Sequence, residues 1–331
     1  MKNKMIVIML VFAMLFSIAI PAFAEDVIEE NNVLETYTID DAYVFPITSD
    51  SPEWDELLTL SDMLDACQIP EEILSRLTND ALLETIANYP LGVNLFAYGD
   101  AETCYNKVKQ QFNGLAELDR RLKSNPNEML ATVNSFSQAN ISRLADAETY
   151  EDVYINRLNL CISVAVAEED SSVTPRYTST YVRTPNGSRV QAYKDFTWTD
   201  MYYNFGHTEE SEQLVCEEYQ DVYDAELLAG INPSYNCHSY AWHDASTNNR
   251  YWINNPSAYI TDGSYDQLTH YYVGSVLLYG STSAPEHSAI IDAVSENHLT
   301  YVISKWGDNG LFRHLYNRCP YDGGVTTYRE S

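Results

Sequence analysis

The sequence predicts an α+β protein in which an N-terminal helical region precedes a domain with a helix packed on an antiparallel sheet. Apolar residues recur at helical spacing through residues 51–167, whereas short apolar runs separated by turn residues follow residue 177. Composition changes at the same place, because 19 of the 26 tyrosines lie in residues 171–331. The acidic stretch 168–176, which contains Pro175, is interpreted as the linker between the two parts.

Residues 1–24 have the anatomy of a secretory signal peptide. Lys2 and Lys4 precede an apolar run over residues 5–20, and Ala22-Phe23-Ala24 forms a small-x-small cleavage site. We see no second apolar stretch long enough to cross a membrane. The sequence therefore predicts a secreted protein that is not held in the membrane after cleavage, and its short Lys/Asn-containing signal suggests a Gram-positive bacterium.

The chain of 331 residues is strongly acidic, with a formal net charge of −29. Such a charge repels phosphate backbones, so nucleic acid is excluded as a general partner. Acidic residues are concentrated in residues 25–100, which contain 18 Asp/Glu and one basic residue, Arg76. Within that stretch residues 25–50 show no hydrophobic period, and they are predicted to form a loose acidic segment.

The helical region is predicted over residues 51–167. Start signals at Ser51-Pro52-Glu53 and Pro70 open two apolar runs, the second of which ends at Tyr89-Pro90. Further helices are expected near residues 102–123, 126–140 and 147–167.

Strands are predicted in the second domain, residues 177–331. A hairpin is expected from Thr178 to Arg183 and from Arg189 to Tyr193, around Pro185-Asn186-Gly187-Ser188. Three apolar runs toward the C-terminus, at residues 273–279, 288–294 and 299–306, are interpreted as consecutive antiparallel strands.

Cys237 is the candidate nucleophile among six irregularly spaced cysteines. No Cys-x-x-Cys pair occurs, which argues against a zinc or redox motif. Asn236 before Cys237, and Tyr240-Ala241-Trp242 after it, place the thiol in the first turn of a buried helix. Free N–H groups at a helix start stabilise a thiolate and can donate to an oxyanion.

His287 is the candidate general base. It lies 50 residues after Cys237 and opens the apolar run His287-Ser288-Ala289-Ile290-Ile291. A histidine at the start of a buried strand can face a helix N-terminus that packs on the same sheet. The order along the chain would be nucleophile and then base, with a third polar group orienting the imidazole from the next strand.

The motif from Asn236 to Ala241 resembles the nucleophile motif of the NlpC/P60 and CHAP superfamily of papain-like cysteine amidases and endopeptidases. Residues 274–279 resemble the strand that follows in that superfamily, with Ser275 in place of its usual Asp, and the run from His287 resembles its histidine strand. The resemblance covers roughly residues 230–310. It implies a papain-like fold and cleavage of an amide bond, in many members within bacterial cell walls.

The third catalytic group is the weakest match. The superfamily places His, Asn, Gln, Asp or Glu on the strand after the histidine, whereas residues 299–307 offer none of these. Ser304 and Asp308 are the candidates, because each can accept a hydrogen bond, whereas the ammonium of Lys305 only donates. A backbone carbonyl or a water molecule remains open as an alternative.

Substrate-binding candidates are the residues around the nucleophile and the tryptophans that follow it. They are Tyr235, Asn236, Tyr240, Trp242, Trp252 and Trp306. The alternative is that these aromatic side chains pack in the core. His238 and His243 stand at a spacing that does not suit a metal-binding pair on one helix face, so neither a metal nor a cofactor is predicted.

Two hypotheses on function follow. The first is a secreted cysteine hydrolase with a peptide or peptidoglycan-like substrate. The second is a secreted binding or interaction protein that keeps the scaffold without catalysis, with a tyrosine-rich recognition surface. The helical region is either an inhibitory pro-segment or a structural domain, and the sequence does not decide between the two.

Overall fold

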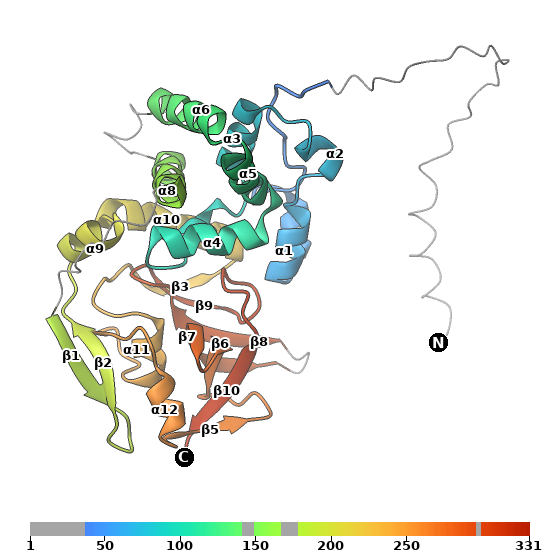
Figure 1. The fold of residues 1–331 in the computed structure, drawn as a ribbon. Coiled ribbons are helices and arrows are strands. Elements are labelled where there is room, and N and C mark those ends of the chain that lie inside the picture. Colours follow the sequence, from blue (N-terminus) through green and yellow to red (C-terminus); the bar gives the residue numbers. More distant parts are fainter. Residues whose placement is uncertain (1–36, 141–148, 167–177, 296–298) are drawn as a thin grey trace, which may run out of the picture. The chain divides into compact units, whose positions relative to one another are not determined.

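The computed structural model describes residues 37–140, 149–166, 178–295 and 299–331. Helices make up the N-terminal part and two antiparallel sheets dominate the C-terminal part, which confirms a mixed α+β fold with an N-terminal helical region (Figure 1). The predicted signal peptide at residues 1–24, residues 25–36 of the predicted loose segment and the predicted linker at 168–176 lie outside the described residues.

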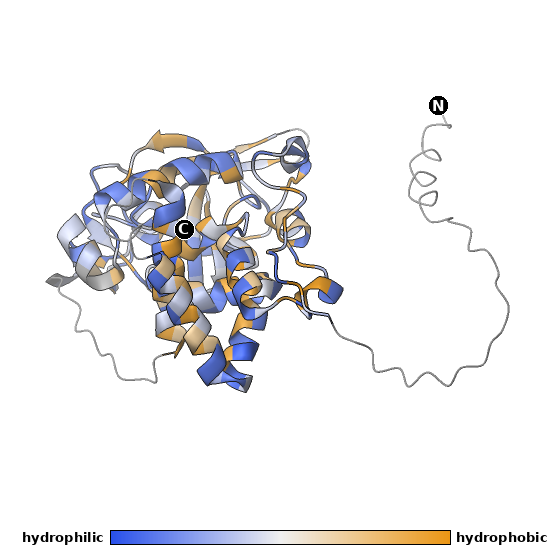
Figure 2. Ribbon diagram, turned by 90° about the horizontal axis from the view of Figure 1, so that it is seen from above, coloured by the Kyte–Doolittle hydropathy of each residue, from blue (hydrophilic) through white to orange (hydrophobic). Residues whose placement is uncertain are grey.

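The helical region is a series of short helices in which hydrophilic and hydrophobic residues alternate (Figure 2). Thr59, Thr78 and Asp100 each accept a backbone N–H bond at the start of their helices, as N-cap residues do. The elements are η2 (Pro52–Glu56), α1 (Leu60–Ala66), α2 (Glu71–Leu74), α3 (Asn79–Ala87), η3 (Gly92–Phe96), α4 (Ala101–Gln111), α5 (Asn113–Ser124), α6 (Pro126–Ala139) and α8 (Tyr150–Val166).

The larger sheet has seven strands in the order β3-β9-β8-β7-β6-β10-β5. All its pairs are antiparallel, and β6, β7 and β8 are sequential neighbours, as the sequence predicted. Its strands are β3 (Glu226–Ala229), β5 (Tyr265–Leu268), β6 (Val276–Ser281), β7 (Ala284–Val294), β8 (Thr300–Lys305), β9 (Leu311–Leu315) and β10 (Val325–Glu330).

The smaller sheet contains the predicted hairpin. It joins β1 (Thr178–Arg183), β2 (Arg189–Lys194) and β4 (Tyr251–Trp252) in that order. Four helices complete the fold: α9 (Trp198–Phe205), α10 (Glu209–Tyr223), α11 (Cys237–Trp242) and α12 (Ser257–Thr261). No helix in the described part of the chain combines the length and apolar character that a membrane span requires.

The two faces of the larger sheet pack against different partners. Successive strand residues alternate between faces, so Tyr279, Ala289 and Phe312 lie on one face and Leu278 on the other. The first face shares one hydrophobic core with the N-terminal helices and α10. The second face packs against α11 through a separate cluster that contains Leu278 and Trp242.

The shared core makes the helical region part of the same unit as the sheet. Residues 38–331 cluster as one compact unit. Trp54 of η2 donates from its indole nitrogen to the carbonyl of Val222 in α10, at 2.8 Å. The described part of the predicted loose segment is also anchored, because Ile39 pairs with Leu77 in an isolated β-bridge and Phe45 is buried in the core. Tertiary packing holds these residues, and such packing leaves no period in the sequence.

Replacing Phe312 with Ala tests this shared core. Phe312 is fully buried and its ring lies against Tyr219 of α10 and Trp306. We expect Phe312→Ala to lower the free energy of unfolding by about 3–5 kcal/mol, because a cavity opens where sheet and helices meet. Urea denaturation followed by far-UV circular dichroism measures this loss. Leu228→Ala on the neighbouring strand β3 is the control, since Leu228 is exposed. A loss equal to that of the control would contradict the shared core.

Candidate active site

Asn236 fixes the start of the nucleophile helix α11. Its side-chain oxygen accepts the N–H of Ser239 at 3.1 Å, which is the N-cap bond, and also the N–H of Ile253 at 3.2 Å. Its amide nitrogen donates to the carbonyl of Ile253 at 2.8 Å. Cys237 is therefore the first residue of the helix, as the sequence predicted. Asn236 serves as a structural clamp here rather than as a wall of an open cleft.

Ser288 attaches α11 to strand β7. Its hydroxyl is bonded to Nδ1 of His238 and to the indole nitrogen of Trp242, both at 2.8 Å. Both partners come from α11 and are buried. Ser288 therefore points toward α11, and the start of this helix is held beside the strand that carries His287.

The Cys237 thiol is surrounded by backbone donors but is deeply buried. Burial raises the pKa of the thiol to about 11, although the N–H groups of Ser288, His238 and Cys237 itself, together with the Lys305 ammonium, act in the opposite direction. A helix start lowers a thiol pKa only where water or charge can support the anion. In this closed site burial is the larger effect, which corrects the expectation of a lowered pKa. The resting group is the neutral thiol.

His287 lies beside Ser288 on β7 but points to the other face of the sheet. Tyr279 on β6 is its cross-strand partner. The Tyr321 ring is stacked on the imidazole at 3.7 Å between centroids. The residue is 0% exposed, and neither ring nitrogen has a hydrogen-bond partner among the described residues. Burial lowers the pKa of His287 well below its usual value, with His314 and His238 adding to the effect. The imidazole is therefore neutral and can accept a proton.

Neither predicted third group orients His287 in this structure. Ser304 is bonded to Nε2 of His314 at 2.7 Å, and Asp308 to Nδ1 of His207 at 2.9 Å. Ser304 shares a sheet face with His287, but the neighbouring strand β9 brings His314 closer. Asp308 follows the end of β8, where the turn directs it toward α10. The predictions for Ser304 and Asp308 rested on strand order alone, which does not fix such cross-strand partners.

A second polar group on the His287 face was not predicted as part of the site. His314 is buried, and it joins Ser304 and the indole nitrogen of Trp306, which donates to Ser304 at 2.8 Å. Burial lowers the pKa of His314 to about 4. The two-residue period of β8 and β9 was the available signal, because it places Ser304 and His314 on one face.

The aromatic residues predicted to line a cleft are buried instead. Each of them is at most 8% exposed, and none lines the cavities of about 460 Å³ and 270 Å³. These residues are Tyr235, Tyr240, Trp242, Trp252 and Trp306. Tyr235 and Tyr240 form one small core cluster, while the three tryptophans belong to three others. Their large apolar area favours packing, which is the alternative that the sequence left open.

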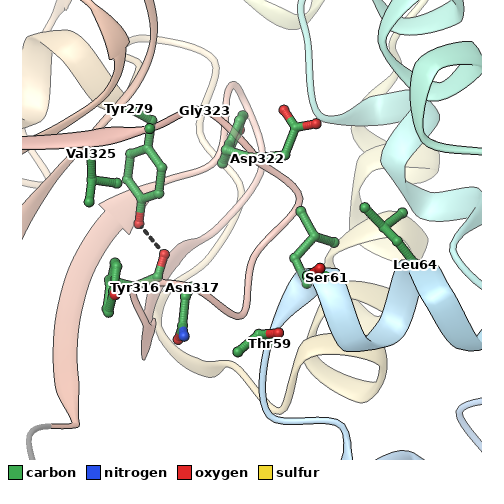
Figure 3. Close-up of a pocket in the computed structure, with 12 residues that line it drawn as sticks. Thr59, Ser61, Leu64, Tyr279, Tyr316, Asn317, Asp322, Gly323 and Val325 are labelled. Carbon is green, nitrogen blue, oxygen red and sulfur yellow. Dashed lines mark hydrogen bonds between the residues drawn. The ribbon is translucent and has the colours of Figure 1, made fainter.

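A cavity of about 460 Å³ lies close to His287 on the helical side of the sheet. Tyr279 and Tyr321, whose rings contact His287, also line this cavity, and Figure 3 shows Tyr279 in its wall. Its other walls include Ser61 and Leu64 of α1 and the turn that carries Asp322. The hydroxyl of Tyr279 donates to the carbonyl of Tyr316 at 2.6 Å, which fixes that ring in the wall.

Comparison of the chain with protein-family models, with curated proteins and with solved structures finds no match in any of the three sets.

The raised pKa of Cys237 predicts slow alkylation in the folded protein. We expect Cys237 to react with iodoacetamide more slowly than free cysteine at pH 7, because a thiol with a pKa of about 11 holds little thiolate there and is also buried. The rate should rise about tenfold per pH unit below that pKa. Peptide mapping by mass spectrometry identifies the labelled cysteine, and labelling in urea is the control. Labelling faster than free cysteine at pH 7 would contradict this description.

Asn236 offers a test of the clamp at the start of α11. We expect Asn236→Ala to cost about 2 kcal/mol or more, since a helix cap and two further buried hydrogen bonds are lost. Asn236→Ser keeps an acceptor for the N-cap bond and loses the two bonds to Ile253, so its cost should be smaller. Thermal unfolding of the two variants measures the difference. Equal losses would show that the cap bond contributes little.

Proposed function

We propose that the protein is a secreted cysteine hydrolase that cleaves an amide or peptide bond, with Cys237 as nucleophile and His287 as general base. One observation carries the proposal. Cys237 opens α11 with its sulfur beside the backbone N–H of Ser288, the strand neighbour of His287. Acyl transfer by a thiol also requires the base side chain within hydrogen-bond reach of the sulfur, so catalysis needs the His287 imidazole, which points to the other face of the sheet, to reach Cys237 when substrate binds.

The chemistry starts from neutral partners. His287 would take the thiol proton as the Cys237 sulfur attacks the substrate carbonyl. The same imidazole would pass that proton to the departing amine, leaving a thioester on Cys237. Water would then attack the thioester, lose a proton to His287, and release the acid and the free thiol. The backbone N–H groups of Cys237 and His238, which now face the sulfur, are the candidate donors to the oxyanion.

Access to the site requires movement of the Tyr321 ring. This ring covers the imidazole and also lines the cavity on the helical side. A substrate that enters from the cavity would meet Tyr321 and Tyr279 first. Displacing Tyr321 would free one face of His287, and the scissile bond would then also have to reach the Cys237 thiol on the α11 side of the sheet.

The predicted signal peptide and the resemblance to NlpC/P60 and CHAP enzymes support a substrate outside the cell. Peptidoglycan peptides are the class that this resemblance favours. The net charge of −29 also disfavours a polyanionic substrate, since like charges repel across the site entrance.

Paired variants test the dyad. We expect Cys237→Ala and His287→Ala each to reduce hydrolysis of bacterial cell walls or of short peptides by about 10⁴-fold, since nucleophile and base act as a unit. Cys67→Ala and His270→Ala are the matched controls, because Cys67 is buried in the helical region and His270 is exposed. The rate is measured as the amine that the mature protein releases from the cell walls or peptides. Hydrolysis that survives in either site variant would eliminate the dyad.

A second candidate function is supported by the closed state of the site. The neutral Cys237 thiol and the unpartnered His287 suit a secreted binding protein that no longer catalyses. The two functions differ in one outcome. If the wild-type chain binds cell-wall peptides without releasing amine, and Cys237→Ala binds equally well, the binding function stands and the hydrolase is excluded.

A further inference from the structure

His207, Glu212 and Asp308 form a buried polar group that is not part of the proposed Cys237–His287 dyad. Nδ1 of His207 stands 2.9 Å from an Asp308 oxygen and 3.5 Å from Oε1 of Glu212. One ligand-type atom from each residue falls within 4.8 Å of the others. All three residues are buried. Two carboxylates so close together, away from water, are stable only with a proton or a cation between them, and a protonated His207 or a metal ion can each take that place.

The described side chains do not satisfy this group. Oε1 of Glu212, at 1% exposure, makes no hydrogen bond although it points at His207, and Nε2 of His207 also has no partner. The nearby cations are used elsewhere. Arg157 donates to the carbonyls of Leu95 and Phe205, and Lys305 to those of Gly307 and Asn309. No Arg or Lys in the described part of the chain forms an ion pair with Glu212 or Asp308.

The local fold preorganises the three side chains. Gly206 ends α9 in the left-handed conformation, at φ 77°, and Thr208 caps α10, so His207 sits in a tight corner between two helices. Glu212 stands in the first turn of α10, and its second oxygen accepts the Asn309 amide at 3.0 Å. A ligand held by a second residue in this way is typical of metal sites.

We propose that His207, Glu212 and Asp308 bind a divalent transition-metal ion of the zinc type. Imidazole nitrogen and carboxylate oxygen are ordinary ligands of such ions. Ligand atoms about 2.0–2.2 Å from a tetrahedral ion lie roughly 3.3–3.5 Å apart, so the observed spacing needs only small shifts. A cavity of about 270 Å³ reaches His207 of this group, and its lining also includes Arg157, Thr208 and Ser211.

The bound ion would stabilise the approach to the nucleophile helix. The carbonyl of Asp308 accepts the N–H of Asn232 at 2.9 Å, and Asn232 lies in the loop that leads to Asn236 and Cys237. An ion on Asp308 would therefore fix that loop to α10. This role does not depend on hydrolysis, so the metal site and the proposed activity can fail separately.

Metal titration of the full mature chain tests the site. After treatment with a chelator, the protein is titrated with Zn²⁺ against a chromogenic competitor, and thermal unfolding is followed in parallel. We expect stoichiometric binding and a higher unfolding temperature with zinc. His207→Ala and Asp308→Asn should each weaken binding about 100-fold or more. Glu218→Gln, on the same helix α10 but outside the group, should bind as the wild type does.

Cobalt(II) separates this site from binding by the six free cysteines. A nitrogen–oxygen site gives weak visible bands without the intense thiolate-to-metal charge-transfer absorption that cysteine ligands produce. We expect only the weak bands, and their loss in Asp308→Asn, a variant of nearly the same shape. Failure of the wild type to bind either metal, strong thiolate absorption, or unchanged binding in both His207→Ala and Asp308→Asn would overturn the proposal.

Discussion

The candidate active site depends on one constraint, which is that side chains along β7 alternate between the two faces of the sheet. His287 and Ser288 are adjacent, so a strand must send them to opposite faces of the sheet. Ser288 then meets α11, accepts the indole N–H of Trp242 and is hydrogen-bonded to His238, while His287 meets the helical region and the ring of Tyr321. The start of α11 lies next to the backbone of Ser288, on the Ser288 side of the sheet. A one-residue shift in register would exchange the two side chains and remove the site.

Burial, rather than a resting ion pair, determines the charge state of the candidate dyad. The Cys237 thiol has a raised pKa and the His287 imidazole a lowered one, so both are neutral and proton transfer between them is uphill. In these neutral forms neither side chain carries a charge that the apolar surroundings would destabilise. A substrate that displaced Tyr321 would bring polar groups and water to the imidazole. For the proposed hydrolase, activation would then accompany substrate binding.

Local signals in the sequence were sufficient for the nucleophile helix and for the strands. Asn236 before Cys237 identified the helix start because capping acts over three residues, and turn residues bounded β6, β7 and β8. The partners of Asp308 and Ser304 were not predictable, since His207 lies 101 residues from Asp308 along the chain. Aromatic residues near the nucleophile were equally ambiguous, because a wall of a cleft and a buried core use the same side chains.

The helical region contacts the surroundings of His287 and also forms part of the core. Tyr321 is stacked on His287 and donates from its hydroxyl to the carbonyl of Ala97, which follows η3. Lys107 of α4 pairs with Glu286, the residue before His287, at 2.6 Å. Both contacts keep the Tyr321 ring over the His287 imidazole from the helical side of the sheet. Because the same helices share the core of the sheet, their removal would expose that apolar face rather than release a finished enzyme. The contacts therefore favour an integral domain that controls access to His287 over a detachable pro-segment.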